Sequence, residues 1–318
     1  MSGGWKATVV LGCVWVAGCA AAPTTTEEAV TERPGEVMAE EPVEEIEWLE
    51  AGIWDVRTGE RLDEAALFEA AAAARFVVVG ESHGAAWHHE VQESVLVGMV
   101  ELGGEPAVGL EMVEARFQET LDAYVAGEIG EQALLHGVEW ETRWGVDHEY
   151  YAPLWRRARV AGLSVVGLNV PREVVRAVGR GGLDSLEGED AELVPDMDLD
   201  DREYRDHLRA IFEAHGMGDD EEALDRFFQA QVLWDEAMAQ RAFEAAGDDG
   251  QVLLIVGRGH MERGFGIPPR LVRRGAAADE VLTVVPVSTE GEIGEAMEEY
   301  RDLRFLQSQG IADVVWVQ

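Results

Sequence analysis

The sequence that decides the fold occurs twice, as FVVVGESH at residues 76–83 and as VLLIVGRGH at residues 252–260. In each copy a short apolar run leads directly into Gly-x-x-His. Apolar runs of this length, bounded by glycine, are typical of strands buried in a parallel sheet. Ligands of open parallel sheets bind beyond the carboxyl ends of the strands. His83 and His260 are therefore expected to face one pocket, although they lie far apart in the sequence.

Apolar strands alternate with helical patterns along most of the remaining chain. Besides the two strands above, strands are expected at residues 53–59 (a strand and turn), 107–112, 163–168 and 281–287. This alternation predicts an α/β fold, with a mostly parallel or mixed central sheet flanked by helices. The helical stretch between the strand at 163–168, the fourth in chain order, and Gln251 is expected to be an insertion. The glycine- and acid-rich residues 179–201 are expected to form an exposed loop.

The first residues have the pattern of a bacterial lipoprotein signal. Lys6 precedes an apolar run at 7–16 that is too short to span a bilayer, and the run leads into Val-Ala-Gly-Cys at 16–19. The pattern predicts a signal peptide over residues 1–18 and lipidation at Cys19. An ordinary secretory signal is the alternative.

Residues 19–47 are rich in Thr, Glu, Pro and Ala, which predicts a disordered acidic tether. A lipid anchor at Cys19 would hold the protein on a membrane. Ala20 follows the cysteine, whereas lipoproteins that stay in the inner membrane have Asp there. By resemblance to lipoproteins that are sorted onward, this favours the outer membrane, with the protein facing the periplasm. Residues 48–318 are then expected to form a single α/β domain.

Composition excludes several classes of function. The formal net charge of −38 and the pI near 4.4 argue against nucleic acid as a partner, because nucleic acid demands a basic face. Lys6 is the only lysine, so the mature chain has none for a Schiff base or a phosphate loop. The only cysteines are Cys13 and Cys19, which leaves no thiol nucleophile and no cysteine-bound zinc.

The candidate site consists of Glu81, His83, Glu111 and His260, each at or just past a predicted strand end. Two imidazoles and two carboxylates suit an acid–base pair, and His83, Glu111 and His260 suit a divalent metal ion. A single histidine at a strand end is more often structural, so the prediction depends on the four residues occurring together.

Other features near Glu81 and His83 allow further interpretations of the site. Residues 80–84 (GESHG) match the G-x-S-x-G nucleophile elbow, but too little of the domain precedes them for the strands that the elbow fold requires. His88 and His89 follow closely and are either haem ligands or polar groups at a helix start. The aromatic cluster at 144–151 is expected to pack in the core or to stack on a flat ligand.

Several blocks of the sequence, in order from about residue 53 to 287, resemble ChaN-like lipoproteins of the haem-binding uptake and Tiki superfamily. The blocks are 76–83 with His88, His89 and Gln92, then 110–112, 168–172, 231–239, 257–260 and 266–268. The resemblance implies an α/β fold, a periplasm-facing lipoprotein and a link to haem or iron acquisition. It also implies relatives among Tiki-type metal-dependent peptidases and erythromycin esterases, in which the positions of His83, Glu111 and His260 lie in the active site. Glu81 belongs to the same Glu-x-His pattern.

The leading hypothesis is a membrane-tethered lipoprotein that binds haem or iron. His83, His260 or the pair His88-His89 would supply the imidazole ligand, and Arg172 or Arg258 would bind haem propionates. Haem shared between two copies would make a homodimer.

A hydrolase is the main alternative. His83 would act as general base or metal ligand, Glu81 or Glu111 would orient it, and His260 would complete the site. A scaffold lipoprotein with a vestigial site is the third reading.

Overall fold

The structure is a computed structural model that describes residues 48–218 and 220–318. The predicted signal peptide (1–18), the lipidation site Cys19 and the predicted tether (19–47) lie outside the described residues. None of the described helices is both long and apolar enough to cross a membrane.

A single mixed sheet organises the described residues, with its strands in the order β2-β1-β8-β7-β3-β6-β4-β5. The strands are β1 (Gly52–Asp55), β2 (Arg61–Leu62), β3 (Phe76–Glu81), β4 (Ala107–Glu114), β5 (Val165–Asn169), β6 (Val252–Gly257), β7 (Val281–Val287) and β8 (Val314–Val317). The strands from β8 to β5 pair in parallel, whereas β1 is antiparallel to both of its neighbours. The predicted α/β class with a mostly parallel or mixed sheet is confirmed.

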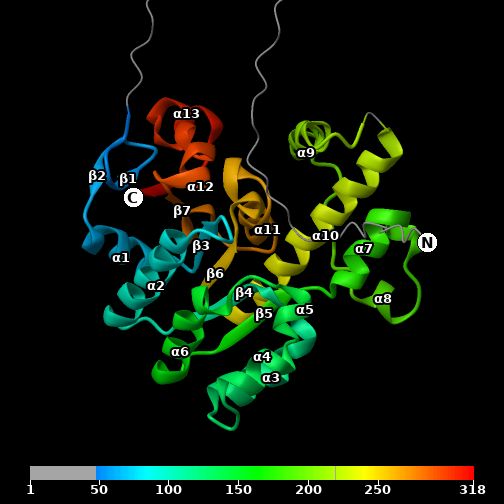
Figure 1. Ribbon diagram of the computed structural model, residues 1–318, viewed down its shortest axis with the longest axis horizontal. Helices are drawn as coiled ribbons and strands as arrows, with labels where there is room; N and C mark the ends of the chain where they lie inside the picture. Colours follow the sequence, from blue (N-terminus) through cyan, green and yellow to red (C-terminus); the bar gives the residue numbers. More distant parts are fainter. Residues whose placement is uncertain (1–47, 219) are drawn as a thin grey trace, which may run out of the picture.

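Helices cover both faces of this sheet (Figure 1). They are α1 (Glu64–Ala73), α2 (Ala86–Glu101), α3 (Gln118–Val125), α4 (Glu131–Gly137), α5 (Trp140–Arg143), α6 (Ala152–Ala161), α7 (Arg172–Gly181), α8 (Glu189–Glu192), α9 (Arg202–Ala214), α10 (Glu221–Ala246), α11 (Ile267–Arg273), α12 (Gly291–Ala296) and α13 (Leu303–Gln309). Buried residues of α1 to α4 and α6 share one apolar cluster, and those of α10, α11 and α13 share the cluster on the opposite face.

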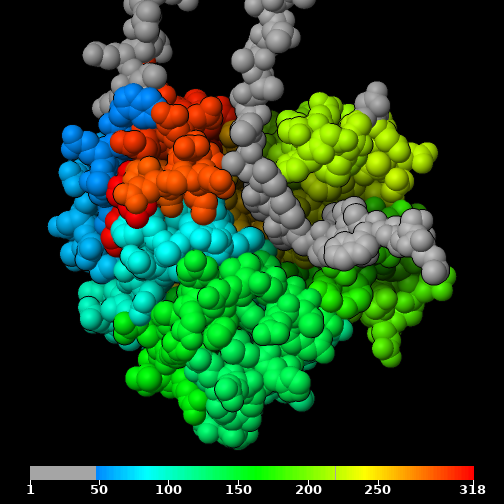
Figure 2. All heavy atoms as spheres, in the orientation of Figure 1, coloured from blue at the N-terminus to red at the C-terminus, as the bar shows by residue number. Residues whose placement is uncertain are grey.

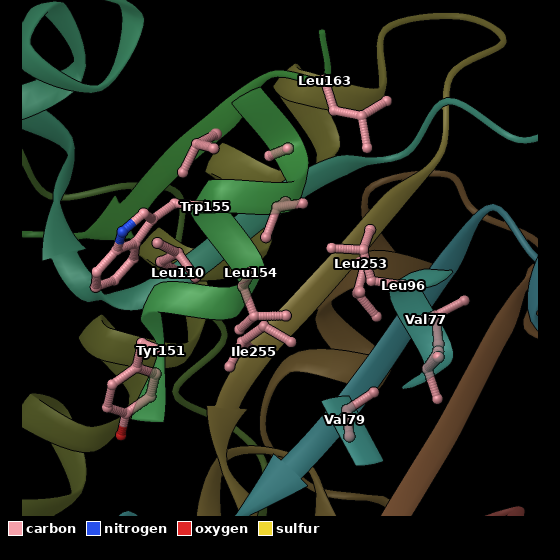
Figure 3. Packing of buried hydrophobic residues seen from close by; sticks show 14 of the residues in the cluster. Val77, Val79, Leu96, Leu110, Tyr151, Leu154, Trp155, Leu163, Leu253 and Ile255 are labelled. Atoms are coloured by element: carbon pink, nitrogen blue, oxygen red, sulfur yellow. The ribbon is translucent and has the colours of Figure 1, made fainter. Parts of the chain in front are cut away.

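Strand periodicity explains how one run of apolar residues serves both faces. Val77 and Val79 of β3 lie in the cluster with α2 and α6, together with Leu253 and Ile255 of β6 (Figure 3). The alternate residues of the same strands point to the opposite cluster, because successive side chains of a strand leave opposite faces of the sheet. A continuous apolar run is therefore what a strand covered on both faces requires.

The predicted helical insertion lies between β5 and β6 and contains α7 to α10. Its residues form the yellow-green lobe beside the body of the molecule (Figures 1 and 2). The prediction of an exposed loop at 179–201 is wrong in part. Helix α7 continues to Gly181, α8 forms within the segment, and Leu183, Leu186 and Val194 pack against the buried residues of α7 and α10.

The C-terminal segment, which the sequence analysis left unassigned, completes the sheet. Strand β8 lies between β1 and β7, antiparallel to the first and parallel to the second. Leu306, Ile311 and Val315 are fully buried in the cluster that also covers β3 and β6. The segment is thus part of the fold that carries the site.

The sheet order brings the two Gly-x-x-His motifs together. Strands β3 and β6 are parallel neighbours, with Gly80 opposite Val256 and Glu81 opposite Gly257. Strand β4 is the other neighbour of β6. These three strands therefore lie side by side. His83 and His260 follow β3 and β6, Glu81 is the last residue of β3, and Glu111 lies within β4, which continues past the predicted strand end to Glu114.

Leu254→Ala tests this core. Leu254 is fully buried in the middle of β6, so the truncation leaves a cavity and is expected to cost about 2–5 kcal/mol of unfolding free energy. Urea unfolding measures the loss. The control Val160→Ala alters a side chain that is 90% exposed and should change stability by less than about 0.5 kcal/mol. Equal effects of the two substitutions would contradict the assigned packing.

Candidate functional site

Gly257, the last residue of β6, is the point where the predicted site residues meet. Its backbone N–H donates a 2.6 Å hydrogen bond to Oε2 of Glu111. A Cβ atom at this position would lie 3.1 Å from Cε1 and 3.4 Å from Nε2 of His83. Nε2 of His260 lies 3.6 Å from the other carboxylate oxygen of Glu111. Glycine thus leaves the space in which His83 and Glu111 approach the end of β6.

Glu81 is buried, with 2% of its surface exposed, and it accepts hydrogen bonds on both carboxylate oxygens. Oε1 lies 2.7 Å from Nδ1 of His83 and accepts a 2.6 Å hydrogen bond from the Tyr151 hydroxyl, while Oε2 accepts one of 2.6 Å from Gln92 Nε2. Burial by itself raises the pKa of Glu81. The hydrogen bond and charge of His83, the charge of His89 and the Tyr151 hydroxyl outweigh it, so the pKa lies below its ordinary value. Glu81 is therefore an ionised acceptor that fixes His83 through Nδ1.

His260 has a matching arrangement that the sequence analysis did not assign. Its Nδ1 lies 2.6 Å from Oδ1 of Asp235, which is fully buried on α10. The other oxygen of Asp235 accepts a 2.7 Å hydrogen bond from the Tyr204 hydroxyl, and the Gln231 amide nitrogen lies 3.1 Å from the same ring nitrogen. The available sequence signal was an acidic residue on the apolar face of a long helix, within the block 231–239.

His88 is buried and uses both ring nitrogens inside the protein. Nδ1 accepts a 2.8 Å hydrogen bond from the backbone N–H of Ser82, and Nε2 lies 3.1 Å from the hydroxyl oxygen of Ser288. Burial, followed by the charges of His89 and Arg258, outweighs the opposing charge of Glu81 and lowers the pKa of His88 to about 3. His88 is neutral and ties the loop after β3 to the end of β7.

His89 also faces partners with both nitrogens. Nδ1 lies 3.0 Å from Oε1 of Gln92, and Nε2 lies 3.0 Å from the backbone carbonyl oxygen of His83. Gln92 directs its amide nitrogen to Glu81, so its oxygen is the atom that accepts from His89. Both nitrogens of His89 therefore face acceptors, and Nδ1 also lies 3.4 Å from Oε2 of Glu81.

Ser82 does not have the geometry of a nucleophile elbow. The elbow places its serine on a strained turn between strand and helix. Glu139 and Arg263 are the non-glycine residues with positive φ among those described, so Ser82 has no such strain. Its N–H is bound to His88, and α2 begins only at Ala86.

The two predicted arginines lie in different surroundings. The Arg258 guanidinium contacts Glu262 and the Tyr300 hydroxyl in a buried group. Burial lowers the pKa of Arg258, but the interactions with these two partners outweigh it and leave the pKa raised. Arg172, at the start of α7, donates to the backbone carbonyl of Thr142 and keeps about a third of its side chain exposed. Neither of these contacts involves His83 or His260.

The predicted aromatic cluster packs against the histidines. The ring of Trp144 meets His83 edge-on at 4.7 Å between centroids, and Tyr150 stacks on His89 at 4.9 Å. Trp234 from α10 meets His260 edge-on at 5.8 Å. The hydroxyl end of Tyr151 points away from the apolar cluster in which its ring lies (Figure 3). Aromatic side chains therefore flank both imidazoles.

The family described as haem-binding uptake, Tiki superfamily, ChaN matches residues 67–271, which is more than half of the chain. The chain belongs to this family. The match covers both Gly-x-x-His motifs, the site strands and the whole insertion, so the resemblance found in the sequence is confirmed.

Two solved structures are similar to this ChaN-family chain, and the first of them shares its fold. The ChaN structure from Campylobacter jejuni, described as showing cofacial haem binding, has 17% identity and a TM-score of 0.62, and the match covers 83% of this chain and 94% of that one. An erythromycin esterase EreC mutant in its open conformation has 14% identity and a TM-score of 0.45, with 76% and 77% covered. No curated protein matches.

A compact group of potential metal ligands occurs elsewhere in this ChaN-family chain. Among the described residues, Glu131, His148 and Glu149 form the group whose ligand atoms all lie within 4.8 Å of one another. Arg156 contacts both glutamates, at 2.6 and 3.1 Å, so their charge is already balanced by a cation. His83, Glu111 and His260 do not gather this closely around one point in this conformation.

His88→Gln tests the buried neutral histidine. With the folded pKa near 3 and an unfolded pKa near 6.5, the unfolded chain binds one more proton between these values. His88 therefore lowers stability as the pH falls through this window. We expect the wild type to lose up to about 1.4 kcal/mol per pH unit more than the variant near pH 5. Urea unfolding at several pH values measures the two slopes, and parallel slopes would contradict the assignment.

Proposed function

We propose that this protein is a cell-envelope lipoprotein of the ChaN family that binds haem for iron uptake, with His83 or His260 as the iron ligand. Its membership of a haem-binding family supports the ligand class. The observation that carries the choice of residues is the pair of imidazoles held through Nδ1 by the buried carboxylates of Glu81 and Asp235.

The chemistry of these residues fits haem. An imidazole that binds iron through one nitrogen is commonly oriented by a carboxylate or carbonyl on the other, which fixes the tautomer and raises the basicity of the ligand. Nε2 of His83 lies beside Gly257, and Nε2 of His260 faces Glu111. Bound haem would supply the iron, and Trp144 and Trp234 would add apolar contacts for the porphyrin.

The contacts narrow the earlier set of ligand residues. His88 and His89 use both ring nitrogens within the protein, which favours a supporting role for them. Arg172, with part of its side chain exposed, suits a propionate better than Arg258, which is already bound to Glu262 and Tyr300.

Haem titration of the full chain tests this proposal. We expect a saturable shift of the Soret band, and a haem affinity about tenfold or more weaker in His83→Ala or His260→Ala. His215→Ala, which alters an exposed histidine at the end of α9, is the control. A shift that survives in both site variants would place the iron ligand elsewhere.

A hydrolase is the second candidate, favoured by Glu111. This carboxylate is 2% exposed and lies within 3.6 Å of His260, and a haem carrier does not need it. In a hydrolase, His83 would act as a general base or metal ligand, with Glu81 orienting it and with Glu111 and His260 completing the site. The absence of a Soret shift, together with a stoichiometric divalent metal ion lost from His83→Ala, would support this candidate over haem binding.

The envelope location is proposed from the sequence, because Cys19 precedes the described residues. Lipidation at Cys19 would anchor the chain to the outer membrane, where it would face the periplasm. A homodimer that shares haem between two copies is part of the same proposal.

Cys19→Ser tests the anchor. We expect the wild-type chain in the membrane fraction and the variant in the soluble fraction or unprocessed, because a single residue carries the lipid. Cys13→Ser, at the other cysteine of the leader, is the control and should remain in the membrane fraction. Fractionation followed by immunoblotting measures the distribution. Equal distribution of the two variants would contradict lipidation at Cys19.

A further inference from the structure

We propose that Asp235 and Tyr204 are positioning residues for His260, and that they form the counterpart of Glu81 and Tyr151 at His83. Each unit would hold its imidazole in the tautomer protonated at Nδ1, so that Nε2 is turned to the side of Glu111. The inference does not rest on the proposed function, because haem binding and hydrolysis would both use imidazoles held in this way.

The two units match in chemistry and in distance. The imidazole Nδ1 to carboxylate distance is 2.7 Å for His83 and 2.6 Å for His260. The tyrosine hydroxyl to carboxylate distance is 2.6 Å at Glu81 and 2.7 Å at Asp235. Both carboxylates and both tyrosines are buried, with at most 2% of each residue exposed.

The units come from unrelated parts of the chain. Glu81 ends β3 and His83 follows it, whereas Tyr151 directly precedes α6 in the cluster on one face of the sheet. Tyr204 and Asp235 come from α9 and α10 of the insertion. Glu111 on β4 lies 3.6 Å from Nε2 of His260, and both Glu111 and His83 lie beside Gly257. No local sequence pattern requires the insertion to supply this second unit.

The contacts determine the tautomer. Oδ1 of Asp235 is an acceptor 2.6 Å from Nδ1 of His260, and its other oxygen already accepts from Tyr204, so we assign the proton of this pair to Nδ1. A neutral His260 then has its lone pair on Nε2, the atom that faces Glu111. The same reasoning places the proton of His83 on Nδ1, beside Glu81.

The tyrosines keep the carboxylates in place as acceptors. Burial, and then the charge and hydrogen bond of Asp235, raise the pKa of Tyr204 well above its ordinary value. Burial and the charge of Glu81 likewise raise the pKa of Tyr151. Both hydroxyls therefore remain protonated donors. Each hydroxyl donates to a carboxylate that burial has removed from water, and the hydrogen bond compensates for part of the lost solvation.

Nitrogen-15 NMR of the histidine rings in the haem-free full chain tests the proposal. Two-bond correlation spectra distinguish the two neutral tautomers, and His83→Gln and His260→Gln identify the signals. In the wild type we expect both rings to be protonated at Nδ1. In Asp235→Asn the amide nitrogen is able to donate to Nδ1, so the His260 signals should shift toward the Nε2-protonated tautomer while those of His83 do not move. Glu81→Gln should have the opposite selectivity.

A merely structural role would not produce this selectivity. Asp225→Asn changes an exposed residue of the same helix that pairs with Arg205, and it should leave both rings unchanged. If Asp235→Asn does not fold, Tyr204→Phe replaces it, and the Nδ1 proton resonance of His260 should move without a change at His83. Protonation of wild-type His260 at Nε2, or unchanged His260 signals in the folded variants, would overturn the proposal. Because the spectra need no haem and no substrate, a failure of haem binding is a separate result.

Discussion

The site depends on the hydrogen bonds that the ionised carboxylate of Glu81 accepts at the buried end of β3. An isolated charge in this position would be costly, and the surrounding structure compensates it with donors from Tyr151, His83 and Gln92 and with the ring of His89, whose Nδ1 lies 3.4 Å away. Each of these donors comes from the loop after β3, from α2 or from the segment before α6. Their positions are therefore coupled, because the displacement of one leaves a buried acceptor or donor without its partner.

The parallel register of β3 and β6 places the end of β3, with Glu81, next to the end of β6, which leads to His260. Glu81 lies opposite Gly257, whose N–H binds the carboxylate of Glu111 and whose lack of a Cβ leaves room for His83. A shift of the register by one residue would turn every side chain of one strand to the opposite face, so the specific packing of the two large apolar clusters maintains the register. The geometry of the site is thus a consequence of core packing on both faces of the sheet.

The strand runs and the Gly-x-x-His motifs could be recognised from the sequence, because each is a local signal. Their convergence could be inferred because parallel strands end at one edge of a sheet. Strand β8 could not be assigned in advance, since its pairing partners are β1, near the start of the domain, and β7. The roles of Asp235 and Tyr204 could not be predicted either. Helical periodicity shows that a position is buried, but it does not show which side chain that position contacts. The segment 179–201 is polar enough to suggest a loop, yet its few apolar residues cover α7 and α10.

The two candidate functions share one chemical requirement and differ in another. Both require imidazoles held in a defined orientation, and the carboxylates of Glu81 and Asp235 provide that orientation at His83 and His260. They differ in the use of Glu111, whose carboxylate lies 3.6 Å from Nε2 of His260 in a site shielded from solvent. A carboxylate in that position suits proton transfer to and from His260, because carboxylates and imidazoles are the usual partners in general acid–base catalysis. In the haem-binding candidate, iron would take Nε2 of His260 although Glu111 faces that atom, so His83, whose Nδ1 contacts Glu81, would be the better placed of the two iron ligands.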